Sequence, residues 1–188
     1  MLIMGKIGFY DTEVFGWRKA IKGMRAPMQS YHLTDSIIYS HILLEIGEAD
    51  LKLMKKLIKG GSEHAKFLRM IHIQVEISMP RYFWSELDTY KVSTVSNSES
   101  TMHKLLNNTK PITVDQFYLG QDEEIAKETW LNIKDSVEKL EDYRQQYKGL
   151  KPTNYTKVQL LTIAKRILPE CFIQTRVLDL NYQTAFNM

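Results

Sequence analysis

Residues 70–90 read MIHIQVEISMPRYFWSELDTY, and their hydrophobic period changes at the proline. In 70–78, apolar and polar residues alternate, which predicts a strand with one buried face. Pro80 has the fixed φ angle of a first helical turn, so we expect a helix from this residue through Tyr90. A strand followed at once by a helix indicates a chain that mixes sheet and helices.

The longest element predicted from the sequence is a helix over 121–148. Its apolar residues recur at spacings of three, four or seven and form one stripe: Ala126, Trp130, Ile133, Val137, Leu140 and Tyr147. Acidic residues crowd its first turn, and Arg144 and Lys148 stand near its end, as the helix dipole favours. Gly149 is the expected stop. We interpret the stripe as a core or subunit contact.

Shorter elements follow from the same signals. We expect helices over 12–24, from Asp50 to Gly60, from Thr153-Asn154 to Arg166, and from 182 onward. In the third of these, Val158, Leu161 and Ile167 are expected to face inward. Residues 91–96 and 171–180 read as strands, 106–120 as a connection, and 26–48 as ambiguous.

The composition is that of a globular protein. Of 188 residues, 44% are hydrophobic and 25% are charged, and no run is long and apolar enough to span a membrane. The opening residues lack a signal-peptide cleavage pattern, and Cys171 is the single cysteine. We therefore expect one domain over 1–188, no membrane association and a cytoplasmic location.

The charge is unevenly distributed along the chain. Residues 121–144 hold eight acidic and four basic residues and so carry a net −4, while the rest of the chain carries +7; together they give the net charge of +3. A basic body suits a phosphate-bearing ligand, although an ordinary mixed surface gives the same numbers. The histidine spacing matches no metal-binding motif, so no metal is expected.

The densest polar stretch runs from Asp88 to His103. Hydroxyls, an amide, a lysine and a histidine within this segment suit an anion such as phosphate. The same residue types also cap helices without any ligand, because Ser and Asn accept hydrogen bonds from free helix N–H groups. From the residues alone, both interpretations stay open.

At this segment the chain resembles the flavin-dependent thymidylate synthases, whose core motif reads RHRxxSxNExSxRY. Glu63-His64 stand where the family has an upstream Glu-His pair, before the strand and helix of 70–90. The motif is matched loosely by Thr89-Tyr90-Lys91 and then by Asn97, Ser100 and His103. Downstream, Ala164-Lys165-Arg166-Ile167-Leu168-Pro169 resembles the family's A-R-x-x-L-P, and Asn181 resembles an asparagine that opens a helix.

The resemblance implies an α+β fold with a central, mostly antiparallel sheet flanked by long helices, assembled as a homotetramer. It also implies FAD as cofactor and a nucleotide such as dUMP as substrate. Carried over residue by residue, it assigns flavin binding to His64, Lys91, Asn97 and Asn181. It assigns nucleotide binding to Ser100 and Lys165, and it assigns no catalytic residue.

The motif is degenerate in ways that argue against full synthase activity. Thr-Tyr-Lys replaces the Arg-His-Arg triplet, and Met102, Lys165 and Gln183 replace family arginines. Each lost arginine removes charge-assisted hydrogen bonds worth about 1.5–3 kcal/mol. The family's last motif would lie beyond Met188, so the chain is interpreted as a divergent, C-terminally short member. The alternative hypothesis is a phage-type, non-enzymatic protein that reuses the fold to bind a host protein.

Overall fold

The computed structural model describes residues 5–40 and 42–188, without the side chains of Met102 and His103. The chain divides into two compact units. Unit 1 comprises 1–9, 77–89 and 97–176, and unit 2 comprises 10–76, 90–96 and 177–188. Met1–Met4 of the opening segment and His41 lie outside the described residues.

The chain contains both strands and helices, as expected for the α+β class. The strands are β1 (Gly8–Phe15), β2 (Ile37–Tyr39), β3 (Ile42–Glu45), β4 (His72–Pro80), β5 (Thr94–Ser98) and β6 (Ile173–Asn181). The α-helices are α1 (Trp17–Arg25), α2 (Glu48–Lys59), α3 (Arg81–Leu87), α4 (Thr101–Lys104), α5 (Glu123–Tyr147), α6 (Lys157–Ile167) and α7 (Tyr182–Asn187). Short 3-10 helices are η1 (Ala26–Met28), η2 (Tyr31–Leu33), η3 (Ala65–Met70) and η4 (Val114–Gln116).

The main sheet is antiparallel, with strand order β1-β4-β6-β5, and confirms the expected fold class. Each of its four strands begins in one unit and continues into the other. A separate hairpin, β2-β3, pairs Ile38 with Leu43 and Tyr39 with Ile42. Among the described residues, every helix is too short or too polar to cross a membrane.

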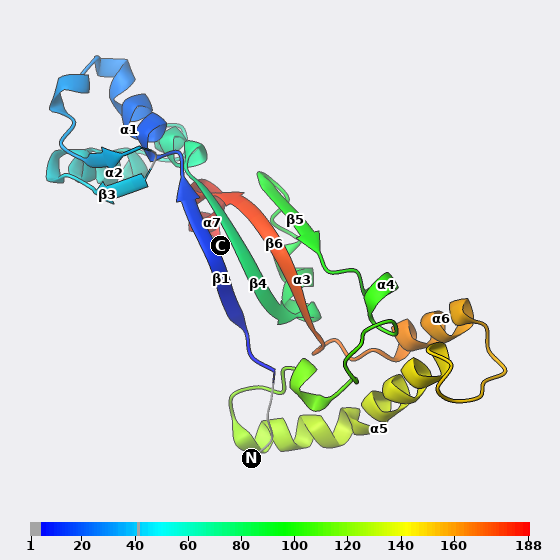
Figure 1. Ribbon diagram of the computed structural model, residues 1–188. Helices are drawn as coiled ribbons and strands as arrows, with labels where there is room; N and C mark the ends of the chain where they lie inside the picture. Colours follow the sequence, from blue (N-terminus) through cyan, green and yellow to red (C-terminus); the bar gives the residue numbers. More distant parts are fainter. Residues whose placement is uncertain (1–4, 41) are drawn as a thin grey trace. The chain divides into compact units, whose positions relative to one another are not determined.

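In unit 1 the core forms around α5 and α6, which lie side by side in Figure 1. The predicted stripe of α5 is confirmed, because Ala126, Val137 and Leu140 are buried and Trp130, Ile133 and Tyr147 pack against the same cluster. The side chain of Asp122 caps α5 by accepting hydrogen bonds from two backbone N–H groups of the first turn.

The helix predicted from Thr153-Asn154 begins three residues later, and the inward position of Val158 was wrong. Thr156 is the cap, in a reciprocal capping box with Gln159. The buried stripe is Leu160 and Ala164, while Val158 is 74% exposed. The physical reason is the helical period: Val158 stands two residues, about 200° of rotation, from Leu160 and so lies on the opposite side of α6. Leu161 and Ile167 pack against the core as predicted.

The start of the helix predicted in the N-terminal region was also wrong. Residues 8–15 form β1, so the helix predicted over 12–24 begins only at Trp17. The change occurs at Gly16, whose φ is +95°, and a Cβ at this position would overlap the carbonyl oxygen of Met70. A glycine is therefore required there, and it ends the strand before the helix begins.

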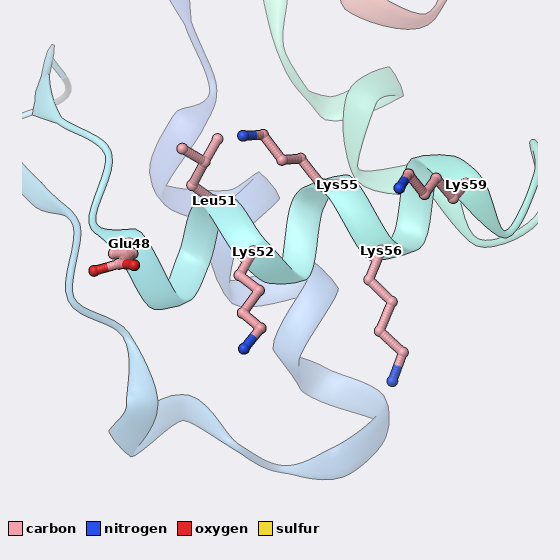
Figure 2. A pocket seen from close by; sticks show the side chains of 6 residues that line it. All are labelled: Glu48, Leu51, Lys52, Lys55, Lys56 and Lys59. Carbon is pink, nitrogen blue, oxygen red and sulfur yellow. The ribbon is translucent and has the colours of Figure 1, made fainter.

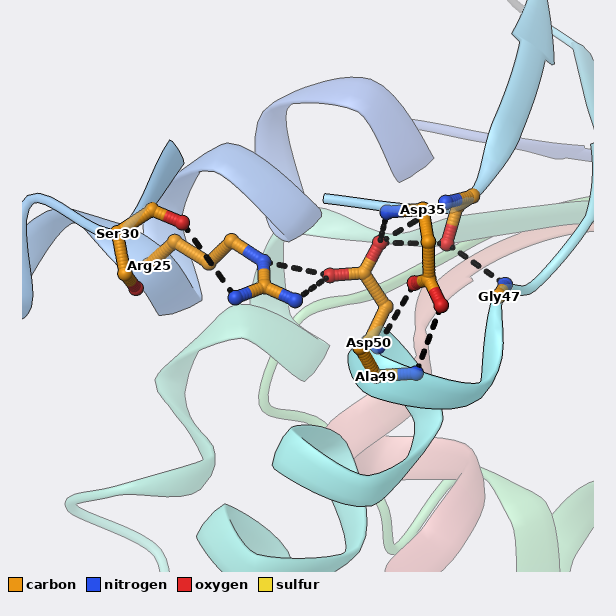
Figure 3. A network of polar contacts seen from close by, with 7 residues as sticks. Arg25, Ser30, Asp35, Gly47, Ala49 and Asp50 are labelled. Carbon is orange, nitrogen blue, oxygen red and sulfur yellow. Dashed lines mark hydrogen bonds and ion pairs between the residues drawn. The ribbon is translucent and has the colours of Figure 1, made fainter. Parts of the chain in front are cut away.

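Asp50 does not cap α2, contrary to the prediction. The N-cap is Gly47, and the carboxylate of Asp35 accepts hydrogen bonds from the backbone N–H groups of Ala49 (2.8 Å) and Asp50 (3.0 Å). The Asp50 side chain is instead fully buried against Arg25, whose Nε and Nη2 both lie 2.6 Å from Oδ1 (Figure 3). Its other oxygen accepts from the hydroxyl of Ser36 at 2.7 Å.

This network joins α1, the segment before β2, and α2. In both Asp35 and Asp50, each carboxylate oxygen accepts at least one hydrogen bond. Oδ2 of Asp50 also accepts from the backbone N–H groups of Asp35 and Ser36. The hydrogen bonds from Ala49 and Asp50 lower the pKa of the Asp35 carboxyl against the opposing effect of desolvation. The apolar core of unit 2 contains Ile21 and Met24 of α1 and Met54 of α2. The polar network therefore fixes how these helices meet.

We predict that Asp50→Asn destabilises the protein by about 3–5 kcal/mol, because it leaves the buried Arg25 guanidinium without a counter-charge. Urea denaturation followed by circular dichroism measures the effect. Asp135→Asn, on the exposed surface of α5, is the matched control and should change the unfolding free energy by less than about 0.5 kcal/mol. Equal stabilities for the two variants would contradict the prediction.

A second polar clamp holds the 106–120 connection to α5 in unit 1. Glu141 accepts two hydrogen bonds from Arg144 (2.7 Å each) and one from the backbone N–H of Ile112 (2.8 Å). Arg144 is buried and donates through Nη1 to the carbonyl of Asn108. The Arg144 hydrogen bonds lower the pKa of Glu141 from 4.5 to about 2, with burial opposing and the Ile112 N–H assisting.

We predict that this clamp stabilises the folded protein above pH 4.5 and is lost as the pH falls from about 4.5 to about 2. The sign follows because the carboxyl binds protons more weakly when folded than when unfolded. At pH 7, Glu141→Gln should lower the unfolding free energy by roughly 2–3 kcal/mol, a difference that should shrink through this pH window. Glu138→Gln, an exposed neighbour, should show no such pH-dependent difference.

Candidate functional site

A small pocket of about 60 Å³ lies where residues 99–105, which include α4, meet the 106–120 connection and the start of β6 in unit 1. Ser100, one of the residues predicted to bind the nucleotide, lines it. The other lining residues are mostly polar: Glu99, Thr101, Lys104, Leu105, Asn108, Gln116, Phe172 and Gln174. The wall therefore offers hydroxyl, amide and ammonium groups beside a single carboxylate.

Backbone hydrogen bonds to β6 hold the wall that carries Ser100. The N–H of Glu99 donates to the carbonyl of Thr175 at 3.0 Å, and the side-chain amide of Gln174 donates to the carbonyl of Glu99 at 2.9 Å. Directly after this, the Lys104 N–H donates to the Ser100 carbonyl and closes one turn. The segment is thus fixed to β6 at Glu99, and the turn that follows carries Ser100, Thr101 and Lys104 on the pocket wall.

Gln174 is buried and is positioned by a second set of contacts. Its Oε1 accepts a hydrogen bond from Arg176 Nε at 3.1 Å. Arg176 also donates to both oxygens of Asp88 (2.9 and 3.1 Å), and its guanidinium lies 4.4 Å from the centre of the Trp84 ring. The Trp84 indole N–H donates to the Gln174 carbonyl at 2.8 Å. These residues support the pocket from behind.

Sequence reasoning missed Gln174, Arg176 and Trp84. The available signal was a polar residue at an inward position of the strand predicted over 171–180, because a buried glutamine must have partners. The partners themselves come from 75 and 90 residues away along the chain, and no local pattern indicates them.

Two further predicted residues in unit 1 lie outside this pocket. Asn97 is exposed on β5. Lys165 is half-buried on α6, and it is not among the residues that line the pocket. The structure therefore brings Ser100 alone, of these three predicted residues, to the pocket wall.

The remaining predicted residues belong to unit 2. His64 is exposed in the turn before η3, and Lys91 is exposed just before β5. Asn181 is buried, and its side chain accepts a hydrogen bond from the Thr184 N–H at 2.9 Å, which caps α7 as predicted. The Thr184 hydroxyl donates to the Val92 carbonyl at 2.9 Å. This bond ties the segment that carries Lys91 to the helix that Asn181 opens.

Unit 2 also holds a polar group on β4 and β6 that sequence reasoning did not single out. His72 Nδ1 lies 2.9 Å from Asp179 Oδ1, and the Gln74 amide donates to Oδ2 at 2.7 Å. Phe15 stacks on the His72 ring with centroids 5.5 Å apart. Burial raises the pKa of Asp179, but hydrogen bonds from His72 and Gln74 lower it below its ordinary value. This carboxylate therefore stays ionised at neutral pH.

Catalysis by a cysteine nucleophile and metal binding find little support in the structure. Burial raises the pKa of the Cys171 thiol, which keeps it in the protonated, weakly nucleophilic form. Among residues 5–40 and 42–188, no cluster of three or more His, Cys, Asp or Glu side chains has an arrangement that would hold a metal ion.

Comparison with solved structures identifies the fold. The chain is similar to the flavin-dependent thymidylate synthase of Helicobacter pylori, solved with FAD and dUMP, with a TM-score of 0.65 and 17% identity. The match covers 97% of this chain and 80% of that one. The predicted thymidylate synthase-like fold is therefore confirmed.

A second similar structure is the UMP/dUMP methylase PolB of Streptomyces cacaoi. Bound to 5-Br dUMP, it matches with a TM-score of 0.60 and 16% identity, over 96% of this chain and 76% of that one. Neither a protein-family model nor a curated protein sequence gives a significant match.

Proposed function

We propose that the chain is a divergent flavin-dependent thymidylate synthase-like protein that binds a pyrimidine nucleotide and FAD, with weak or absent synthase activity. The observation that carries this proposal is the fold likeness over 97% of the chain to a structure solved with both ligands. The continuity of all four sheet strands through both units supports the proposal of a single domain over 1–188. A cytoplasmic location remains part of the proposal.

The pocket at Ser100 is the proposed position of the nucleotide phosphate. Ser100 and Thr101 carry hydroxyl groups, and Lys104 carries a positive charge with no ion-pair partner among the described residues. A volume of about 60 Å³ suits one small anionic group rather than a whole nucleotide. We keep Lys165 as a second source of positive charge for this ligand.

The proposed flavin ligands are His64, Lys91, Asn97 and Asn181. Three of them are exposed with side chains that donate hydrogen bonds, which fits the phosphates and carbonyls of a flavin nucleotide. Asn181 retains its amide N–H₂ for a ligand, since its oxygen already caps α7. When bound, FAD supplies the redox chemistry, and the residues of this chain supply position and charge.

The proposal of weak activity rests on the missing guanidinium groups. Lys91 and Lys165 keep a positive charge where the resembled motifs have arginine, but an ammonium lacks the planar fork that binds two oxygens at once. Thr89 and Tyr90 carry no charge at all in neutral solution. Binding is therefore expected to survive better than the positioning that catalysis needs.

We expect the purified protein to retain added FAD after dialysis, seen as an absorption band near ~450 nm. Titration calorimetry should detect dUMP binding, and Ser100→Ala should weaken it about 10- to 100-fold, because a hydrogen bond to a charged phosphate contributes about 1.5–3 kcal/mol. Ser85→Ala, an exposed serine on α3, is the matched control and should bind dUMP like the parent chain.

The outcomes separate the parts of the proposal. FAD retention without dUMP binding would remove the nucleotide site at Ser100. Unchanged dUMP affinity in a folded Ser100→Ala variant would do the same. If neither ligand binds, the enzyme-like proposal fails as a whole.

We also propose that the chain forms a homo-oligomer, a tetramer by the family resemblance. The outer face of the β2-β3 hairpin supports this, because its four large apolar side chains are all more than half exposed: Ile37, Tyr39, Ile42 and Leu44. The opposite face of the hairpin carries Ile38 and Leu43, which pack against the core of unit 2. A hairpin that is apolar on both faces is expected to be covered on both.

Light scattering after size-exclusion chromatography should give four times the chain mass. Tyr39→Ser with Ile42→Ser should lower the measured mass, because the substitutions remove apolar area from the outer hairpin face. Val158→Ser, an equally exposed apolar residue on α6, should leave the mass unchanged. A parent chain that is monomeric at micromolar concentration would contradict the proposal.

The second candidate is a phage-type interaction protein that uses this same apolar face to bind a host protein. It would be favoured by a monomeric chain that binds neither FAD nor dUMP. The exposed hairpin face is the observation that supports it.

A further inference from the structure

A basic surface on α2 of unit 2 has no part in the nucleotide or flavin proposal. Four lysines, Lys52, Lys55, Lys56 and Lys59, line an open hollow of about 650 Å³ together with Leu51 and Glu48. All four are exposed, and none forms an ion pair or side-chain hydrogen bond with another described residue. We define these four residues as the lysine face.

The spacing of the lysine face follows from the helix itself. Lys52 and Lys56 are four residues apart and extend on one side of α2, while Lys55 extends on the other (Figure 2). The four ammonium groups are attached along about 10 Å of helix. Two rows of positive charge therefore border the same hollow.

The helix gains little from this arrangement by itself. Lysines four apart on one helix repel each other, and both Lys52/Lys56 and Lys55/Lys59 have this spacing. The helix dipole favours positive charge only in the last turn, which accounts for Lys56 and Lys59 but not for the other two. A bound polyanion would remove the repulsion along the whole face.

Positive charge continues beyond the helix. Residues 52–69 contain six basic residues and one acidic residue, and within the part of the chain that the structure describes only Lys66 of the six forms an ion pair, with Glu63. Glu48 is the one acidic group on the hollow, at the opposite end of α2. The electrostatic potential over Lys52–Lys59 is thus positive along the whole lysine face.

We propose that the lysine face binds the phosphodiester backbone of a nucleic acid. Lysine binds phosphate as a point charge without a fixed geometry, which suits a repeating backbone read without regard to sequence. A membrane surface fits less well, because the apolar side of α2 is already used: Met54 is buried, and Leu53, Leu57 and Ile58 pack against the core. The inference is independent of the proposed FAD and dUMP sites.

Fluorescence anisotropy with a labelled 20-nucleotide oligothymidylate tests the proposal. With four phosphate contacts, the logarithm of the binding constant should fall with the logarithm of salt concentration at a slope of about −2.8, a loss of about 50-fold between 50 and 200 mM salt. Lys52→Gln with Lys56→Gln should halve this slope and weaken binding about tenfold at 50 mM salt.

The control removes the same charge from a different helix. Lys127→Gln with Lys134→Gln on α5 should leave the affinity and the salt slope unchanged, and circular dichroism should confirm that both double variants are folded. Equal slopes for the two double variants would overturn the proposal, as would no binding at 50 mM salt. Displacement of the oligonucleotide by poly-L-glutamate as efficiently as by unlabelled oligothymidylate would also overturn it, in favour of an acidic protein partner.

Discussion

The backbone carbonyls of residues 170–175 accept hydrogen bonds from three other parts of unit 1, and the candidate pocket depends on this constraint. Helix α3 donates two backbone N–H groups and the Trp84 indole, the 106–120 connection donates through Tyr118, and residue 99 donates to Thr175. Burying any of these donors without a hydrogen-bond partner would cost free energy. The hydrogen bonds to the carbonyls of this one segment therefore bring together the elements that form and support the pocket wall.

Elements with one strong periodic signal were predicted well from the sequence. Helix α5 has a long apolar stripe, acidic residues at its start and a glycine after its end, and each local signal agrees with the observed helix. Strand β4 and helix α3 were recognised from the change in period at Pro80, although their bounds moved by two or three residues. The presence of both strands and helices was predicted correctly because these elements are encoded locally, whereas the α+β fold with its antiparallel sheet was predicted from the family resemblance.

The prediction for Asp50 was wrong for a reason that sequence patterns rarely reveal. An aspartate before an apolar run has the pattern of a helix cap, but Arg25, 25 residues earlier, recruits this carboxylate into the interior. Asp35 then takes over the capping, 15 residues before the N–H group of Asp50. The same limit applies to the candidate site: Ser100 was proposed from a motif, whereas Gln174 and Arg176 are placed there only by contacts that the fold creates.

The clamp at Glu141 links proton binding to the shape of the candidate pocket. Asn108 lines that pocket, and its carbonyl accepts a hydrogen bond from the same Arg144 that pairs with Glu141. A ligand that binds this pocket only when Asn108 is held in this position therefore favours the ionised form of Glu141. By reciprocity, such a ligand would lower the pKa of Glu141 further, and protonation of Glu141 in acid would weaken binding of the ligand. Protonation of Glu141 and occupancy of the pocket are thus two separate equilibria that both depend on Arg144.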